Sequence, residues 1–183
     1  VAGGGIAGVC TAVAATRAGA KVALIQDRPV LGGCNSSEIR VPLGGLLHMP
    51  PYPALGNVVQ EISPITGSPG VHPAEFYEDA RKANIFRTLP NDRYRLLLNT
   101  RVVAVEMAPD NPKRIAACIA RNVLTGAETR FRARLFADCT GDAVVSRMAG
   151  AEVMTGRESR DTYGASLAPV QGDNQVMGMS VIW

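Results

Sequence analysis

The chain begins with a glycine-rich turn that restricts its fold more than any other feature. Val1 and Ala2 read as the end of a strand, and the six residues from Gly3 to Gly8 spell G-x-G-x-x-G. In this motif the first glycine allows a tight turn, the second lets a pyrophosphate approach the backbone, and the third lets the next helix pack closely on the strand. The helix then presents free N–H groups and its positive dipole end to the phosphates. The turn therefore predicts a dinucleotide-binding site.

The residues after the turn complete the βαβ unit that this motif requires. Small residues stand where the helix must lie on a sheet, and an apolar strand is expected over residues 21–25. The residue that contacts the adenosine ribose normally follows the glycines by about 20 positions. That position is Gln26, a neutral amide, so Asp27 and Arg28 beside it are expected to share the role.

Near residue 94 the spacing of apolar residues changes from that of helices to that of strands. Residues 94–107, 114–124 and 128–136 read as three strands, with turns over 110–112 and 125–126, and together predict an antiparallel β-meander over about 94–136. Short helices are expected over residues 57–62, from Pro73 through Ala83, and over 143–149, where Gly150 ends the helix. Ser36 or Ser37 is expected to cap a helix. Residues 41–56 and 65–73 read as irregular loops.

Composition and charge exclude several classes of protein. The net charge of +3 over 183 residues is too small to indicate binding of nucleic acid or of a membrane surface. No apolar run approaches the roughly 20 residues that span a bilayer. The four cysteines form no CxxC pair and no metal-ligand cluster, so we expect no metal site and favour the reducing cytoplasm. Both ends of the sequence look truncated, so the sequence gives no information about targeting signals. The oligomeric state also stays open.

Two further segments are expected to share a ligand with the glycine turn. Leu31-Gly32-Gly33 follows the second strand and leads into Ser36 and Ser37, whereas Thr140-Gly141-Asp142 follows a later strand. A glycine at a strand end allows close approach of the backbone, and a carboxylate beside it can accept hydrogen bonds from hydroxyl groups. Taken alone, a Gly-Asp pair is more often a turn with a helix cap.

The order of these motifs resembles the FAD-binding half of flavoproteins with a glutathione-reductase-type Rossmann domain. More narrowly, residues 26–40 resemble the bacterial FAD-dependent oxidoreductase family of the heterodisulfide reductase A-like type, and residues 139–142 and 156–159 support the same family. The resemblance implies an α/β fold: a Rossmann-like FAD/NAD(P)-binding domain over 1–150, with a parallel sheet and an inserted antiparallel β-meander. Residues 151–183 are then expected to begin a second, substrate or cap domain.

The resemblance also implies FAD as the cofactor. The glycine turn is expected to hold the pyrophosphate, the end of the second strand the ribose, and Val102 the adenine edge through its backbone. The residues expected to bind FAD are Gly3, Gly5, Ile6, Ala7, Gly8, Gln26, Asp27, Arg28, Gly32, Gly33, Ser36, Ser37, Val102, Thr140, Gly141 and Asp142.

The expected activity is transfer of hydride or electrons between FAD and a small-molecule substrate or an electron carrier. Arg40 and His48 are the candidate catalytic residues, although Arg40 could instead brace the phosphates and a loop histidine is more often a surface residue. Cys34 follows Leu31-Gly32-Gly33 without the C-x-x-x-x-C partner of disulfide reductases, which disfavours that chemistry. The alternatives are a flavoprotein that passes electrons to an iron–sulfur partner and a plain NAD-binding Rossmann protein.

Overall fold

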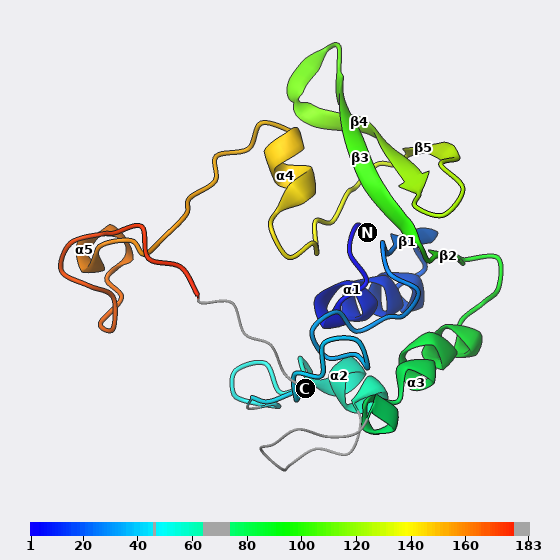
Figure 1. Cartoon of the computed structure of the whole chain (residues 1–183), viewed down its shortest axis with the longest axis horizontal. Coiled ribbons are helices and arrows are strands. Elements are labelled where there is room, and N and C mark those ends of the chain that lie inside the picture. Colours follow the sequence, from blue (N-terminus) through cyan, green and yellow to red (C-terminus); the bar gives the residue numbers. More distant parts are fainter. Residues whose placement is uncertain (46, 64–73, 178–183) are drawn as a thin grey trace.

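Two small β-sheets organise the chain, and short helices lie against them (Figure 1). The computed structural model describes residues 1–45, 47–63 and 74–177. The elements follow one another as α1 (Ile6–Arg17), β1 (Val22–Ile25), α2 (Asn57–Ile62), the 3₁₀ turn η1 (Ala74–Tyr77), α3 (Asp79–Asn84), the 3₁₀ turn η2 (Ile85–Thr88), β2 (Tyr94–Leu97), β3 (Thr100–Ala108), β4 (Asn111–Asn122), β5 (Glu128–Arg132), α4 (Val144–Met148) and α5 (Arg160–Tyr163).

The parallel sheet is the one that the glycine turn predicts. β1 pairs with β2 in parallel, from Val22 opposite Tyr94 to Ile25 opposite Leu97. On the other side of β1, Ala2 forms parallel bridges to both Ile25 and Asp138. The order across this sheet is therefore β2, β1, Ala2 and Asp138. This arrangement confirms the α/β class and brings the segments that follow β1, Ala2 and Asp138 to one edge of the sheet.

The antiparallel sheet confirms the β-meander but corrects its bounds: β4 already begins at Asn111, within the expected turn, β5 ends at Arg132, and the start also differs. β3, β4 and β5 pair in sequence order, whereas residues 94–97 form β2 in the parallel sheet. The expected single strand over 94–107 breaks at Asn99, whose φ is +50°. Asn is one of the few residues that adopt this left-handed conformation readily. The backbone N–H of Asn99 donates to Arg28 and its carbonyl accepts from Val123, so the residue forms a corner between the two sheets.

Helix predictions were partly right. α2 and α4 confirm the helices expected over 57–62 and 143–149, and Gly150 follows α4 with φ +74°. The helix expected from Pro73 to Ala83 is instead η1 followed by α3, because Glu78 between them has φ +42°. Pro73 and the whole loop expected over 65–73 lie outside the described residues. The helix expected after Ser36 or Ser37 does not form, because residues 33–39 adopt turns and bends.

Two apolar clusters hold the sheets to the helices. In the first, α1 packs against β1 and the crossover through Val9, Val13, Leu24 and Phe86. In the second, Ala2, Ile25, Val102, Ala120 and Val145 join the parallel sheet, the meander and α4. Burial of one such Val or Ile side chain stabilises the fold by about 1.5–3 kcal/mol. In this second cluster, Ala2 and Ile25 of the parallel sheet pack against Val102 and Ala120 of the meander and so hold the two sheets together.

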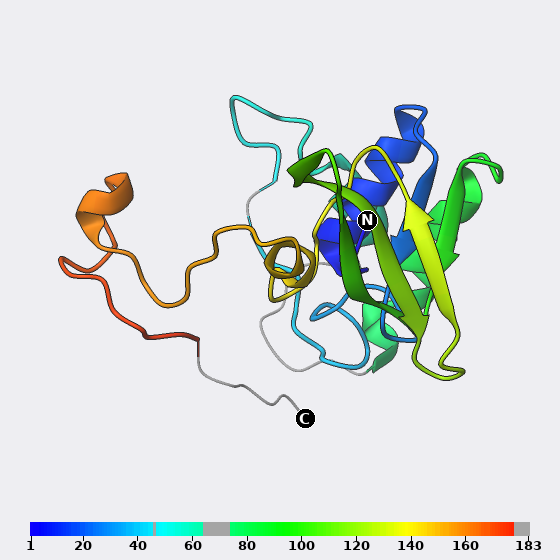
Figure 2. The ribbon, with the colours of Figure 1, turned by 90° about the horizontal axis from the view of Figure 1, so that it is seen from above.

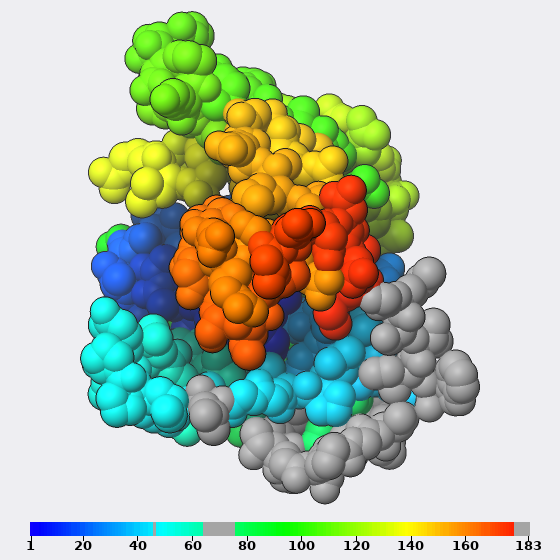
Figure 3. Space-filling view, turned by 90° about the vertical axis from the view of Figure 1, so that its left-hand side faces the viewer, coloured from blue at the N-terminus to red at the C-terminus, as the bar shows by residue number. Residues whose placement is uncertain are grey.

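After α4 the chain leads away from both sheets (Figures 1 and 2, orange to red). Residues 151–177 carry α5 and contain no buried residue. An ion pair closes this segment on itself, with Arg157 Nε 3.0 Å from Asp173 Oδ1. Viewed from that side, the segment stands in front of the rest of the chain (Figure 3). Among the described residues, no helix is long and apolar enough to cross a membrane.

Candidate cofactor site

A cleft of about 780 Å³ opens where the glycine turn, the end of β1, the loop after it, the start of β3 and the residues before α4 meet. Pockets for small molecules usually measure about 300–1,000 Å³. Most residues expected to bind FAD line this cleft, namely Gly3, Gly5, Ile6, Ala7, Gln26, Asp27, Arg28, Gly32, Gly33, Val102, Thr140, Gly141 and Asp142.

The three motif glycines differ in what surrounds them. Gly3 has φ +90°, and a Cβ there would lie 2.4 Å from the carbonyl oxygen of Cys139. A Cβ on Gly8 would lie 1.8 Å from the carbonyl oxygen of Gly3, so this glycine allows the close packing of α1 on the turn and does not line the cleft. A Cβ on Gly5 would meet nothing within 4 Å. Open space therefore lies above Gly5, where the motif predicts a phosphate.

The N-terminus of α1 supplies hydrogen-bond donors to this space. α1 begins at Ile6, its N-cap is Gly5, and no side chain caps it. The first N–H groups of a helix have no acceptor within the helix, and the helix dipole adds partial positive charge there. Gly5, Ile6 and Ala7 line the cleft. The turn can therefore bind an anionic group through its backbone.

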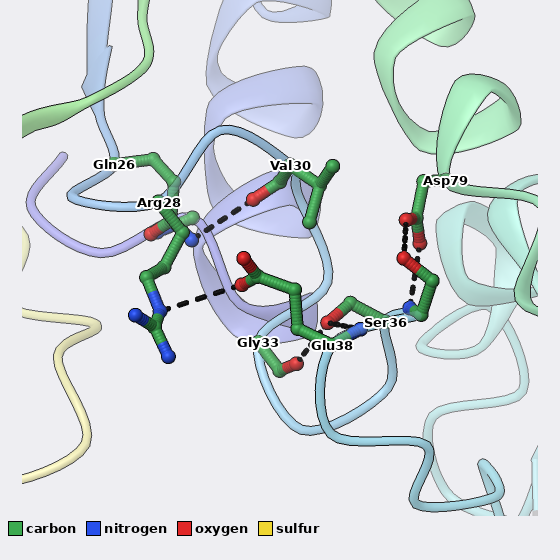
Figure 4. A network of polar contacts seen from close by, with 9 residues as sticks. Gln26, Arg28, Val30, Gly33, Ser36, Glu38 and Asp79 are labelled. Carbon is green, nitrogen blue, oxygen red and sulfur yellow. Dashed lines mark hydrogen bonds and ion pairs between the residues drawn. The ribbon is translucent and has the colours of Figure 1, made fainter. Parts of the chain in front are cut away.

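The structure changes the expected role of Gln26. Its Oε1 accepts a hydrogen bond from the N–H of Gly4 at 2.8 Å. Its Nε2 donates to the carbonyl oxygen of Val30 at 3.1 Å (Figure 4). The amide is 4% exposed and braces the glycine turn from beneath. Asp27, in contrast, is exposed in the cleft, and its carboxylate has no hydrogen bond or ion pair within the described parts of the chain. Asp27 is therefore the better-placed acceptor for ribose hydroxyls.

An ion pair lies across the loop that follows β1. Arg28 Nε is 3.3 Å from Glu38 Oε2, and both residues line the cleft (Figure 4). The sequence predicts Arg28 in the site but does not predict Glu38. The guanidinium is 55% exposed, so we attribute little stability to this pair. Its position leaves an exposed cation beside the glycine turns.

The glycines of Leu31-Gly32-Gly33 lie against the glycine turn. The N–H of Gly32 donates to the carbonyl oxygen of Gly4 at 2.8 Å, and a Cβ on Gly33 would lie 3.1 Å from Gly5 Cα. Ser36 and Ser37 do not line the cleft, contrary to expectation. Ser36 Oγ donates to the carbonyl oxygen of Gly33 at 2.7 Å, and the Ser37 hydroxyl donates to Asp79 (Figure 4). Both hydroxyls are used within the protein.

A half-buried carboxylate holds the Thr140-Gly141-Asp142 turn. Asp138 accepts hydrogen bonds from the N–H and hydroxyl of Thr140, at 3.1 and 2.6 Å, and from the N–H and hydroxyl of Ser146, at 2.8 and 2.9 Å. Burial raises the pKa of Asp138, but these hydrogen bonds together outweigh it and hold the pKa below its usual range. Asp142 is exposed in the cleft, and within the described residues its carboxylate is not hydrogen-bonded or ion-paired. The turn thus presents one uncommitted carboxylate to the cleft.

The two candidate catalytic residues lie elsewhere. Arg40 Nε donates to the carbonyl oxygen of Ser37 at 3.1 Å, and the ring Nδ1 of His48 contacts the carbonyl oxygen of Pro53. Neither Arg40 nor His48 lines the cleft. Both have positive φ, +63° and +60°, which marks them as turn residues in the loop. A catalytic role for either stays a prediction that this geometry does not support.

Several residues of the cleft were not predicted from the sequence. Val144 and Met148 lie four positions apart on α4, a spacing that places both on one helix face and could have identified them. The missed residues in loops have no regular spacing that could have identified them. The residues missed are Ala2, Ile25, Cys34, Asn35, Glu38, Ile39, Val41, Pro42, Leu43, Thr100, Arg101, Val103, Cys139, Val144 and Met148. All four cysteines are free, including the exposed Cys34.

Comparison with known proteins identifies the family of this chain. The sequence profile of the family described as FAD dependent oxidoreductase matches residues 1–181. A search of curated proteins found no match. Nine chains of known structure match, among them the flavin-dependent monooxygenase PieE in complex with FAD and substrate. That likeness has a TM-score of 0.51 at 14% identity and covers 85% of this chain.

The chain corresponds to 32% of the matched monooxygenase chain, that is, about a third of its length. At this identity the likeness shows the fold, a Rossmann-like FAD-binding domain. The family profile covers nearly the whole chain, and the predicted cofactor, FAD, is the cofactor of that family. This chain therefore belongs to the FAD-dependent oxidoreductase family.

Proposed function

We propose that this chain forms the FAD-binding part of an oxidoreductase that transfers hydride or electrons between the flavin and a small-molecule substrate or an electron carrier. The observation that carries the proposal is the cleft, where the glycine turn, the end of β1, Gly32-Gly33 and the Thr140-Gly141-Asp142 turn come together. Segments so distant in sequence meet at the edge of a parallel sheet, which is where α/β proteins bind their ligands.

The residues of the cleft fit the chemical groups of FAD. The N–H groups at the start of α1 would bind the diphosphate above Gly5, where a Cβ would have no neighbour. Asp27 and Asp142 would accept hydrogen bonds from hydroxyl groups. Asn35 also lines the cleft, and in the described structure its buried Oδ1 has no hydrogen-bond partner. Buried acceptors are usually satisfied, so this atom favours a site completed by a ligand.

Bound FAD supplies the hydride or electron transfer, and the protein binds and orients it. The chain's own cleft residues would bind the diphosphate and hydroxyl groups, and the apolar residues Val102, Val144 and Met148 would line one wall beside the cofactor. We place the chain in the heterodisulfide reductase A-like subgroup, on the resemblance of residues 26–40. Cys34 has no second cysteine in this loop, so we do not propose a dithiol relay. Four free cysteines favour a cytoplasmic location.

The test is a titration of the purified chain with FAD, followed by visible absorbance and flavin fluorescence. We expect the wild-type chain to bind FAD and Gly5→Val to lose binding, because the branched side chain fills the space above the turn. Gly5→Val should remain folded, since no atom lies within 4 Å of the new Cβ. Gly44→Val is the matched control, because its Cβ also meets nothing within 4 Å and Gly44 does not line the cleft. A wild-type chain that never binds flavin would refute the proposal.

A further inference from the structure

The loop that carries Gly32 and Gly33 into the cleft has no helix or strand of its own. This glycine–serine loop, residues 32–40, has a single bridge from Gly32 to Gly5 followed by turns and bends over 33–39, and it provides several of the cleft residues. Irregular loops keep one conformation only where other contacts hold them. Those contacts come from residues 77–82, at the start of α3 and just before it, in the crossover between β1 and β2.

Asp79 makes the most direct of these contacts. Its Oδ1 accepts a hydrogen bond from the N–H of Ser37 at 3.0 Å, and its Oδ2 accepts one from the Ser37 hydroxyl (Figure 4). Both carboxylate oxygens are therefore used by one loop residue. Ser36, the residue before Ser37, donates its hydroxyl to the carbonyl oxygen of Gly33, which is the glycine that faces Gly5. Asp79 thus holds the residue next to the one that bonds Gly33.

Two further residues of the same segment support the loop at its ends. Lys82 is 0% exposed, and a Cβ on Gly32 would lie 2.9 Å from its Cδ and Cε. Lys82 Nζ donates to the carbonyl oxygen of Tyr77 at 2.6 Å, and the buried Tyr77 hydroxyl donates to the carbonyl oxygen of Arg40. The loop is thus held at its start, its middle and its end by residues 77–82.

We propose that Asp79 is a positioning residue for the cofactor: it holds Ser37 so that Gly32 and Gly33 stay against the glycine turn in the shape that binds the FAD diphosphate. The inference rests on the proposed function. Asp79 does not line the cleft, so it acts through the loop and makes no contact with the ligand. Sequence motifs of the glycine turn and of the loop do not include this crossover residue.

Whether Asp79→Asn raises or lowers the affinity for FAD distinguishes a positioning role of Asp79 from a purely electrostatic one. Asp79 is a negative charge near a site for an anionic diphosphate, so its field alone would weaken FAD binding, and Asp79→Asn would strengthen it. Positioning predicts the opposite result. Asn keeps the size of the side chain but cannot accept both hydrogen bonds, and hydrogen bonds to charged groups contribute enough for a roughly 10- to 100-fold weaker FAD affinity.

The experiment measures the dissociation constants of FAD and AMP for the full chain and four variants. We expect Asp79→Asn and Ser37→Ala to weaken FAD binding roughly tenfold or more, and the double variant to be no weaker than Asp79→Asn alone, because both changes remove the same contact. The visible circular dichroism of bound FAD should also change. AMP affinity should stay constant, since AMP spans the adenosine side of the glycine turn. Glu78→Gln, which removes the adjacent charge from an exposed pair with Arg81, is the control and should match the wild type.

Each possible result of these binding measurements leads to a different conclusion. If the wild type binds no FAD, the proposed function fails first. If it binds FAD and Asp79→Asn binds as tightly or more tightly, the positioning role is wrong. Equal losses for FAD and AMP, with a lower melting temperature, would mean that Asp79 only supports the fold. Should Asp79→Asn fail to fold, Ser37→Ala alone decides, and wild-type FAD affinity in that variant overturns the inference.

Discussion

At the scale of single residues, two nearby carboxylates have opposite environments. Asp138 accepts four hydrogen bonds from Thr140 and Ser146, whereas Asp142 is exposed in the cleft and, among the described residues, has no partner. A carboxylate that already accepts hydrogen bonds within the protein stabilises the structure around it. One that faces a cleft without a partner can accept hydrogen bonds from a ligand. Asp138 is therefore structural, and Asp142 is the candidate ligand-binding residue.

Asp142→Asn tests this assignment. The carboxylate contributes about 1.5–3 kcal/mol through a hydrogen bond from the ligand, whereas the Asn amide oxygen can still accept a neutral bond of about 0.5–1.5 kcal/mol, so FAD should bind roughly tenfold more weakly. The free energy of unfolding without FAD should not change, because Asp142 has no partner to lose among the described residues. A fluorescence titration measures the first quantity and denaturant unfolding the second. Asp161→Asn, an exposed change in α5 outside the cleft, is the control. Unchanged FAD affinity in Asp142→Asn would leave this carboxylate a turn residue only.

Residue positions were easier to predict from the sequence than side-chain directions. The spacing from the glycines points to Gln26, the first residue after β1, yet its amide turns inward to the N–H of Gly4. Likewise, the serines after Gly33 do lie beside the cleft, but their hydroxyls bond Gly33 and Asp79. Spacing along one strand or loop carries no information about partners such as Asp79, which follows Ser37 by 42 positions.

At the scale of elements, α4 and the turn before it depend on Asp138. The Thr140 hydroxyl donates to Asp138 and accepts from the N–H of Val144, so the carboxylate reaches the first residue of α4 through one hydroxyl. A second set of bonds reaches Ser146 within the helix. α4 has five residues and is too short to be stable alone. Its stability therefore comes from this carboxylate and from the packing of Val145.

Asp138→Asn should destabilise the fold in a pH-dependent way. Because the folded pKa of Asp138 is lower than the unfolded value, its contribution is present above about pH 3.9 and is lost as the pH falls through the folded pKa. We expect the variant to be less stable by about 1–3 kcal/mol at neutral pH and the difference to shrink on acidification. Denaturant unfolding of both proteins from neutral pH to about pH 3 measures this. A pH-independent difference would mean that shape, and not charge, explains the effect.

Elements whose apolar residues recur at a clear spacing were predicted from the sequence. Breaks that depend on one residue in the left-handed conformation were not. α1, β1 and the meander follow their patterns, whereas the break between β2 and β3 depends on the left-handed Asn99. The helix from Pro73 onward breaks at Glu78 for the same reason. Asn is a recognisable signal for such a conformation, but Glu is not, so only the first break could have been anticipated.

At the scale of the whole molecule, residues 1–150 contain every residue that lines the cleft and every buried residue of the described structure. Residues 151–177 lead away from the sheets and close on themselves through Arg157 and Asp173 (Figure 2). This distribution agrees with the predicted boundary near residue 150, which stays a prediction. We therefore expect residues 1–150 to fold and to bind FAD without the residues that follow.

A chain that ends at Gly150 tests that boundary. We expect it to keep the FAD affinity of residues 1–183, because no described residue after 150 lines the cleft, and to unfold at nearly the same denaturant concentration. A ligand that binds only the folded state stabilises it by about 2.7 kcal/mol at a concentration 100 times its dissociation constant. FAD at that excess should therefore stabilise both lengths of chain equally, and Gly5→Val should abolish the gain in each. If the shorter chain folds but loses FAD, residues beyond 150 complete the site, and the cleft between the glycine turn and α4 is only part of it.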